Sequence, residues 1–187
     1  MGCDNTKGRN FIPCKNSVAG IKGIYITSFD DYSFVTSSRD AGTASISAGH
    51  ILTDLGDLSE IFHYKLRNSG NTYQEDSTTS SDTGTTKFTQ TLNFTLTKIS
   101  AEMQFQIKMF VWGRSMIFVE FNSGDIILMG KNFGCEINGS TQIQGTLESL
   151  NGYVMTAISD DSESQYFLDD ATKIALKALV STENVTD

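Results

Sequence analysis

The sequence is poor in the residues that most often build metal sites and covalent frameworks. It has two histidines, three cysteines and one proline among 187 residues. The cysteines are odd in number and none stands in a CxxC pair with a histidine nearby, so neither a disulfide framework nor a zinc site is indicated. A single proline and sixteen glycines are typical of a folded chain and argue against collagen-like or long disordered tracts.

Long hydrophobic runs are absent as well. No stretch approaches the roughly eighteen apolar residues that a membrane-spanning helix needs. Residues 1–10 are polar and lack the apolar core of a secretory signal. We therefore expect a protein that is made and kept in a soluble compartment, and the length predicts one domain with one hydrophobic core.

Positive charge is scarce. The chain has 14 basic and 22 acidic residues and a formal net charge of −8. An acidic surface repels phosphate backbones and anionic membranes, which argues against a nucleic-acid-binding protein.

Motifs that carry chemistry are missing too. No nucleophile elbow, phosphate-binding loop, HExxH or dinucleotide fingerprint lies near His50 or His63. Neighbouring residues of a strand point to opposite faces, so the paired aspartates are more typical of solvated turns than of a metal site: Asp30-Asp31, Asp160-Asp161 and Asp169-Asp170. We predict no catalytic residue, no cofactor and no metal site, and hence no enzyme.

One short motif points to a membrane. Residues 1–6, MGCDNT, match the N-myristoylation pattern, and Cys3 offers a second acyl site. Nothing downstream resembles a signalling domain. An acylated peripheral membrane protein therefore stays as an alternative.

Three regions follow one another along the chain. Residues 1–22 are polar and locally basic and are predicted to be an arm, residues 23–158 to be a β-sandwich domain, and residues 159–187 to be an acidic C-terminal extension. Alternating apolar and polar residues predict an antiparallel sandwich or partly closed barrel. Three hairpins are predicted: residues 23–29 with 32–36, residues 115–121 with 126–129, and residues 141–147 with 153–158, the last with its turn at Asn151-Gly152. Further strands are predicted over residues 61–67 and 87–98.

Two segments have helical spacing. Apolar residues from Ile99 to Val111 predict a helix over about 100–112, capped by Ser100 and ended by Gly113, with its apolar stripe on the sheet. Trp112 and the phenylalanines are expected in the core. Residues 170–180 can form a short amphipathic helix, with Asp169 or Asp170 as its cap.

The segment 68–86 consists almost wholly of Ser, Thr, Asp, Gly and Asn and offers little to a core. A polar excursion of about fifteen residues or more inside a compact domain is usually functional or disordered. We predict a contact loop, whose candidate interface residues are Thr72, Tyr73, Gln74, Thr79, Ser80, Thr85 and Thr86.

The region from about residue 60 to 158 resembles tailed-bacteriophage virion proteins of the tail-tube type. The resemblance rests on the order of a polar loop, a strand from TTKFTQTL (85–92), a helix, the hairpin IFVEFNSGDIILMG (117–130) and the segment TLESLNGYVMT (146–156). The N-terminal arm and the acidic tail depart from the pattern. They leave open whether the chain is the repeated tube subunit or a ring, terminator or completion protein.

The resemblance implies a β-sandwich with a flanking helix that assembles into hexameric rings, whose inner strands line a channel that DNA passes without specific binding. It also implies a place in the virion tail after assembly in the host bacterial cytoplasm, with further copies and other tail proteins as partners and no membrane. A net charge of −8 suits such a channel. The basic N-terminus facing an acidic tail would offer a charge-complementary pairing between subunits.

A carbohydrate-binding or adhesin-like β-sandwich remains a second alternative. Such a module needs exposed aromatic side chains in a groove, and Tyr64, Tyr73 and Tyr153 are the candidates.

Overall fold

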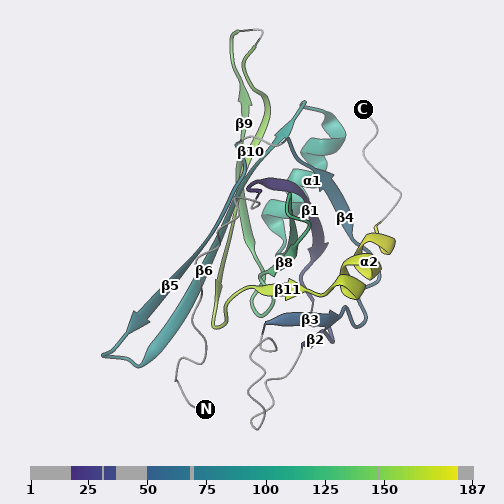
Figure 1. The fold of residues 1–187 in the computed structure, drawn as a ribbon. Helices are drawn as coiled ribbons and strands as arrows, with labels where there is room; N and C mark the ends of the chain where they lie inside the picture. The colour runs from purple at the N-terminus through teal and green to yellow at the C-terminus, as the bar shows by residue number, and fades with distance from the viewer. Residues whose placement is uncertain (1–17, 31, 37–49, 68–69, 147, 181–187) are drawn as a thin grey trace.

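The computed structural model describes residues 18–30, 32–36, 50–67, 70–146 and 148–180, which form two β-sheets and two helices (Figure 1). The predicted class, a mainly β sandwich with one packed helix, is confirmed, and neither sheet closes into a barrel. The larger sheet has the spatial order β2 (Val35–Thr36), β3 (Ile51–Asp54), β11 (Tyr166–Leu168), β8 (Ile126–Met129), β7 (Ser115–Phe121), β1 (Ile21–Ser28) and β4 (Phe62–Lys65). The smaller sheet has the order β5 (Thr72–Ser80), β6 (Thr85–Thr97), β10 (Asn151–Asp161) and β9 (Glu136–Ile143).

The seven-stranded sheet is covered on both faces, which explains the nearly continuous apolar sequence of β7 and β8. Ile117 and Val119 of β7 belong to the core between the two sheets. Met116 and Phe118, which alternate with them, belong to a second core on the opposite face. The predicted hairpin of β7 and β8 is confirmed.

Both predicted helices are confirmed with their caps. Helix α1 (Ala101–Trp112) begins after Ser100, whose side chain accepts a hydrogen bond from the Met103 N–H. It packs against β9 and buries Ile107 and Phe110 in the core between the sheets.

Helix α2 (Asp170–Ala178) begins after Asp169, which caps the Thr172 N–H, and it buries Leu176 against the other face of the seven-stranded sheet. The pattern of apolar residues and caps was therefore sufficient to locate both helices.

The predicted hairpin over 23–36 is wrong. β1 instead lies between β4 and β7, and the two-residue strand β2 pairs with β3. β1 is buried along most of its length, so it needs strands on both sides, and these come from distant parts of the chain. Alternation of apolar residues predicts a strand but does not say which strand is its neighbour.

The acidic C-terminal segment is more than an extension. β10 runs on to Asp161, β11 lies between β8 and β3, and α2 covers the sheet, so residues 159–180 belong to the domain. At the other end, residues 18–22 lead into β1 and contribute to it. The remainder of the predicted arm, residues 1–17, lies outside the described residues.

The predicted loop over 68–86 is wrong for most of its length. β5 and β6 form a hairpin whose register runs from Thr72 opposite Asn93 to Ser80 opposite Thr85. Threonine is favoured in strands, and the ladder satisfies the backbone polar groups without any buried side chain. β10 ends opposite Phe88, so residues 78–87 form a two-stranded projection that extends away from the body (Figure 1). This projection is called the arm below and is distinct from the predicted N-terminal arm.

The third predicted hairpin exists but is displaced. β9 already begins at Glu136, and the connection to β10 spans residues 144–150. Asn151 and Gly152, the predicted turn, are the first residues of β10. A glycine is needed at position 152 because a Cβ there would lie 2.2 Å from the Leu96 carbonyl oxygen on β6.

Candidate assembly surfaces

The four-stranded sheet has an apolar inner face and a polar outer face. Inward residues such as Leu92, Phe94 and Met155 join the core between the sheets. The alternate residues share the opposite face, where they are half-buried or exposed. We call this face the polar wall; its hydroxyl and amide side chains belong to Thr72, Gln74, Thr89, Thr91, Asn93, Thr95, Asn138, Ser140 and Thr156.

Hydrogen bonds link the polar wall across three strands. Thr156 Oγ1 donates to Asn93 Oδ1 at 2.8 Å, and Asn93 Nδ2 donates to Thr72 Oγ1 at 3.1 Å. Thr89 Oγ1 also donates to Asp160 at 2.7 Å. These side chains therefore satisfy part of one another's hydrogen-bonding capacity across the polar wall.

Negative charge predominates on the polar wall. Asp76, Glu136 and Asp160 lie on this face by their strand register, together with Lys87, which forms an ion pair with Asp160 at 3.1 Å. Such a surface repels phosphate groups more than it attracts them.

The structure separates six of the seven predicted interface residues into two groups and places Tyr73 elsewhere. Thr72 and Gln74 lie on the polar wall. The other four threonine and serine residues lie in the arm, with Thr79 opposite Thr86 and Ser80 opposite Thr85. They do not form a single contact patch.

Tyr73, the remaining predicted interface residue, points inward and packs edge-on against Phe121, with ring centroids 6.1 Å apart. Burial, with a smaller effect of the Glu75 carboxylate, raises the pKa of its hydroxyl. Tyr73 therefore supports the sandwich and is poorly placed for contact with a partner.

An exposed apolar stripe was missed at the sequence level. Phe105, Met109 and Trp112 follow one another at helical spacing on the outer side of α1 and are 59%, 49% and 73% exposed. The expectation that Trp112 lies in the core is wrong, because Ile107 and Phe110 occupy the inner side of the helix. Lys108 lies over the Trp112 ring, 4.1 Å from its centroid. The signal was present, since α1 carries apolar residues on both sides instead of one.

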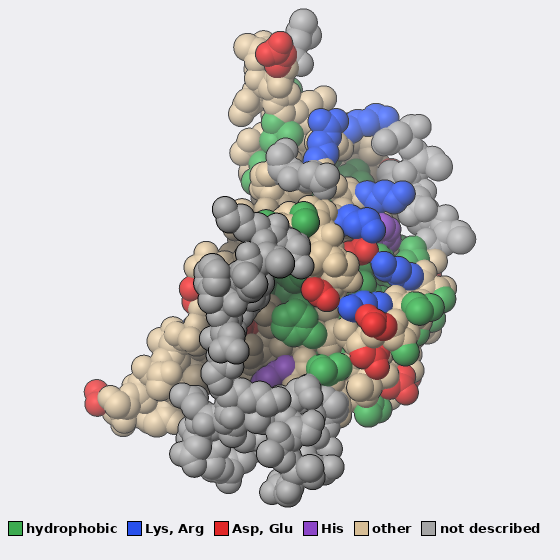
Figure 2. Space-filling view, viewed as in Figure 1, with side chains coloured by type: hydrophobic (Ala, Val, Ile, Leu, Met, Phe, Trp, Pro, Cys, Tyr) green, Lys and Arg blue, Asp and Glu red, His purple; other side chains and the backbone are tan. Residues whose placement is uncertain are grey.

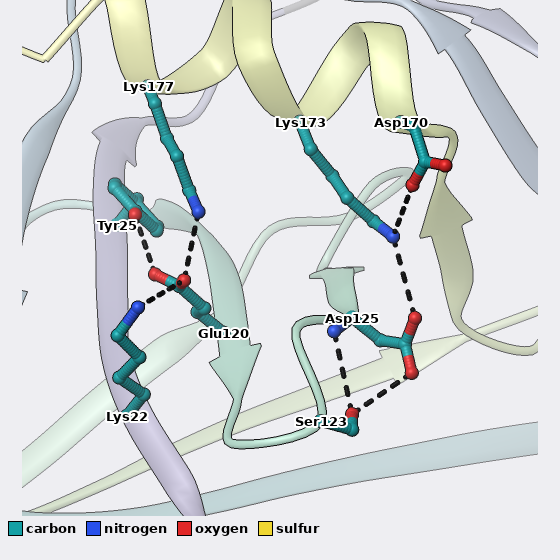
Figure 3. Close-up of polar contacts among 8 residues, drawn as sticks. All are labelled: Lys22, Tyr25, Glu120, Ser123, Asp125, Asp170, Lys173 and Lys177. Carbon is teal, nitrogen blue, oxygen red and sulfur yellow. Dashed lines mark hydrogen bonds and ion pairs between the residues drawn. The ribbon is translucent and has the colours of Figure 1, made fainter.

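A buried carboxylate was also missed. Glu120 is the one charged residue of β7, and its side chain is almost fully buried beneath α2. Figure 3 shows it held between three donors from separate elements: Tyr25 Oη at 2.7 Å, Lys22 Nζ at 3.1 Å and Lys177 Nζ at 3.0 Å. A single charge within an apolar strand was the sequence signal, because burial of an unpaired charge is costly.

The contacts of Glu120 decide its protonation. Burial opposes ionisation, but the hydrogen bonds from Tyr25, Lys177 and Lys22 outweigh it and lower the pKa of Glu120 to about 2. Burial also lowers the pKa of His63, which stacks on Tyr25 with ring centroids 4.3 Å apart. This ion network joins β1, β7 and α2 beside the second core.

The three tyrosines proposed for carbohydrate binding do not form an exposed platform. Tyr153 is buried, and Tyr64 and Tyr73 pack against the core between the sheets. The structure therefore removes the residues on which that alternative depended. Gly2 and Cys3, on which the acylation alternative depends, lie outside the described residues.

Comparisons with protein-family models, curated proteins and solved structures found no match. Within the described ranges, neither helix has the length and apolar character needed to cross a membrane. The same part of the chain holds no cluster of three or more His, Cys, Asp or Glu residues suited to a metal ion.

Proposed function

We propose that this chain is a virion structural subunit of the tail-tube type, which self-assembles into rings around a channel for DNA. The observation that carries the proposal is the exposed apolar stripe of α1. Soluble monomers rarely leave a contiguous apolar patch uncovered, and such a patch commonly marks a protein–protein contact. A second copy of the chain is the partner that a ring requires.

The polar wall supports the channel part of the proposal. A conduit has to let DNA pass without retaining it, so its wall needs hydration and few unpaired cations. The polar wall has hydroxyl and amide groups, an excess of carboxylates, and one lysine that is paired with Asp160; Arg67 and Lys98 lie at its margin, beside Thr95. We assign this face to the channel and α1 to the contact between subunits.

The first experiment measures the solution mass of the purified chain over a range of concentrations, with negative-stain images of the same samples. Rings or tubes support the proposal. A stable monomer at every concentration contradicts self-assembly by this chain alone.

A pair of variants locates the contact. Phe105→Ser/Trp112→Ser should weaken association by more than tenfold, because exposed aromatic residues commonly anchor interfaces. Ile174→Ser is the matched control, since Ile174 lies on α2 and is 72% exposed but stands outside the stripe. Equal effects of both changes would show that α1 has no special role.

A further inference from the structure

A groove lies at the opposite side of the body from the arm. It has a volume of about 790 Å³ and runs between β4, the end of β6 and the start of α1. Val180, just beyond α2, lies at its margin. Its walls include apolar side chains as well as charged ones, among them Phe62, Tyr64, Leu96 and Met103.

The groove is basic although the chain as a whole is acidic. Lys65, Arg67 and Lys98 line it, against one carboxylate, that of Glu102. Among the described residues, neither Lys65 nor Arg67 has a carboxylate partner. Nearby lysines on β1 and α2 are already occupied by Glu120, Asp125 and Asp170. Figure 2 shows Lys and Arg side chains gathered on this side of the molecule, at upper right.

The groove also contains an open sheet edge. β4 is the last strand of the seven-stranded sheet in the described part of the chain. The Leu66 N–H donates to the Lys22 carbonyl at 3.3 Å, so by alternation Lys65 and His63 direct their backbone groups away from β1. Ile61, just before β4, forms an isolated parallel bridge with Val180, so the start of this edge is already paired, while β4 itself has no outer neighbour among the described residues.

A matching edge lies at the other end of the molecule. β5 is the outer strand of the four-stranded sheet, has nine residues, and contains neither proline nor a basic residue. The segment 72–86 carries Glu75, Asp76 and Asp82 and no Lys or Arg. Asp76 is exposed, and Asp82 lies in the turn at the end of the arm. In Figure 2 the end of the arm, at lower left, shows an acidic and no basic side chain.

We propose that the β5 edge of one copy docks into the basic groove of a second copy and pairs with β4. This inference rests on the proposed self-assembly and names the second pair of surfaces that it uses. Asp76 and Asp82 then lie near Lys65 and Arg67, while the backbone groups of two open edges satisfy each other. Because the two surfaces differ, the contact is head-to-tail and closes into a ring or continues as a filament.

Charge exchange tests the pairing. Lys65→Glu/Arg67→Glu should weaken association about tenfold at low salt, as should Asp76→Lys/Asp82→Lys, and the loss should shrink as salt is added. Mixing the two variants should restore association, since each supplies the charge that the other now needs. Arg114→Glu/Lys131→Glu makes the same change in net charge away from the groove and should associate like the unmodified chain.

Disulfide trapping tests the register directly. Cys3 and Cys14 are replaced by Ser, while the buried Cys135 is kept. Lys65→Cys and Asp76→Cys proteins are then mixed and oxidised. A predominance of the mixed dimer over both homodimers supports the pairing, because a disulfide needs Cα atoms within about 7 Å.

Four outcomes would overturn the inference. If Lys65→Glu/Arg67→Glu assembles as well as the unmodified chain, the chain self-assembles but the groove takes no part in the contact. A monomeric unmodified chain contradicts self-assembly by this chain alone, on which the inference rests. If the unmodified chain retains duplex DNA, and Lys65→Glu/Arg67→Glu assembles normally but does not retain it, the groove is a phosphate-binding site. Disulfide trapping that yields the two homodimers as readily as the mixed dimer removes the pairing of Lys65 with Asp76.

Discussion

The two sheets of this protein differ in how many of their faces are buried. In the seven-stranded sheet, β7 and β8 are buried on both faces between two hydrophobic cores. In the four-stranded sheet, β6 and β10 bury alternate residues and turn hydroxyl and amide groups outward. Both faces of the first sheet are therefore packed, whereas the second sheet has one packed face and one polar face. Substitutions on packed faces should affect unfolding, and substitutions on the polar wall and at the sheet edges should affect association.

The largest effect on stability is expected from β7. Phe118 is fully buried in the second core, so Phe118→Ala should lower the free energy of unfolding by about 3 to 5 kcal/mol. Thr91→Ala on the polar wall of β6 should cost less than about 1 kcal/mol. Urea denaturation of both variants measures the contrast. A similar cost for the two substitutions would contradict the contrast between packed faces and the polar wall.

An intermediate effect is expected from the ion network. Glu120→Gln removes the charge that Lys22 and Lys177 share, and it should lower the free energy of unfolding at pH 7 by about 2 kcal/mol. Denaturation midpoints at pH 7 provide the measurement. An unchanged midpoint would show that the buried carboxylate contributes no net stability.

The same variant gives a prediction about pH. The pKa of Glu120 is lowered to about 2 in the folded chain from an ordinary value of 4.5, so its contribution is complete above pH 4.5 and is lost as the pH falls toward 2. The pKa of His63 is also lowered, from 6.5, so acidification below that value removes further stability. The difference between Glu120→Gln and the unmodified chain should therefore shrink below pH 4.5. A constant difference down to pH 2.5 would contradict this assignment.

The smallest effect on stability is expected from the arm. Replacing residues 79–86 with an Asn-Gly turn joins Thr78 to Lys87 and removes only two-stranded, largely exposed structure. The free energy of unfolding should change by less than about 1 kcal/mol, whereas association should fall at least tenfold. Urea denaturation and solution mass of the same sample measure both. Full assembly without the arm would restrict the contact to the body.

Local signals predicted much of this fold. The caps at Ser100 and Asp169 located the two helices, and the Asn-Ser-Gly-Asp turn located the hairpin of β7 and β8, because each signal lies next to the element that it defines. The neighbours of β1 could not be predicted in this way, since they depend on contacts between distant residues. The hairpin of β5 and β6 was missed because a low apolar content was interpreted as a loop, although threonine favours strands.

The candidate surfaces were predicted less well than the fold. Thr79, Ser80, Thr85 and Thr86 do lie on a projection, but it is an ordered hairpin. Trp112 and Phe105, on the exposed side of α1, were assigned to the core, because the sequence shows that both sides of the helix are apolar but not which residues pack. The basic groove depends on Lys65, Arg67 and Lys98, which line it together only in the folded chain.

The position of β1 has a consequence for the timing of folding. β1 pairs with β7, and Lys22 and Glu120, which meet across this pair, are 98 residues apart in the chain. At about 5 to 20 residues per second, synthesis leaves β1 without this neighbour for roughly 5 to 20 s. Pairing across so long a separation is also intrinsically slow. We therefore expect the yield of folded chain to be limited by a late folding step, so that fast expression at high temperature favours aggregates and slow expression favours folded protein.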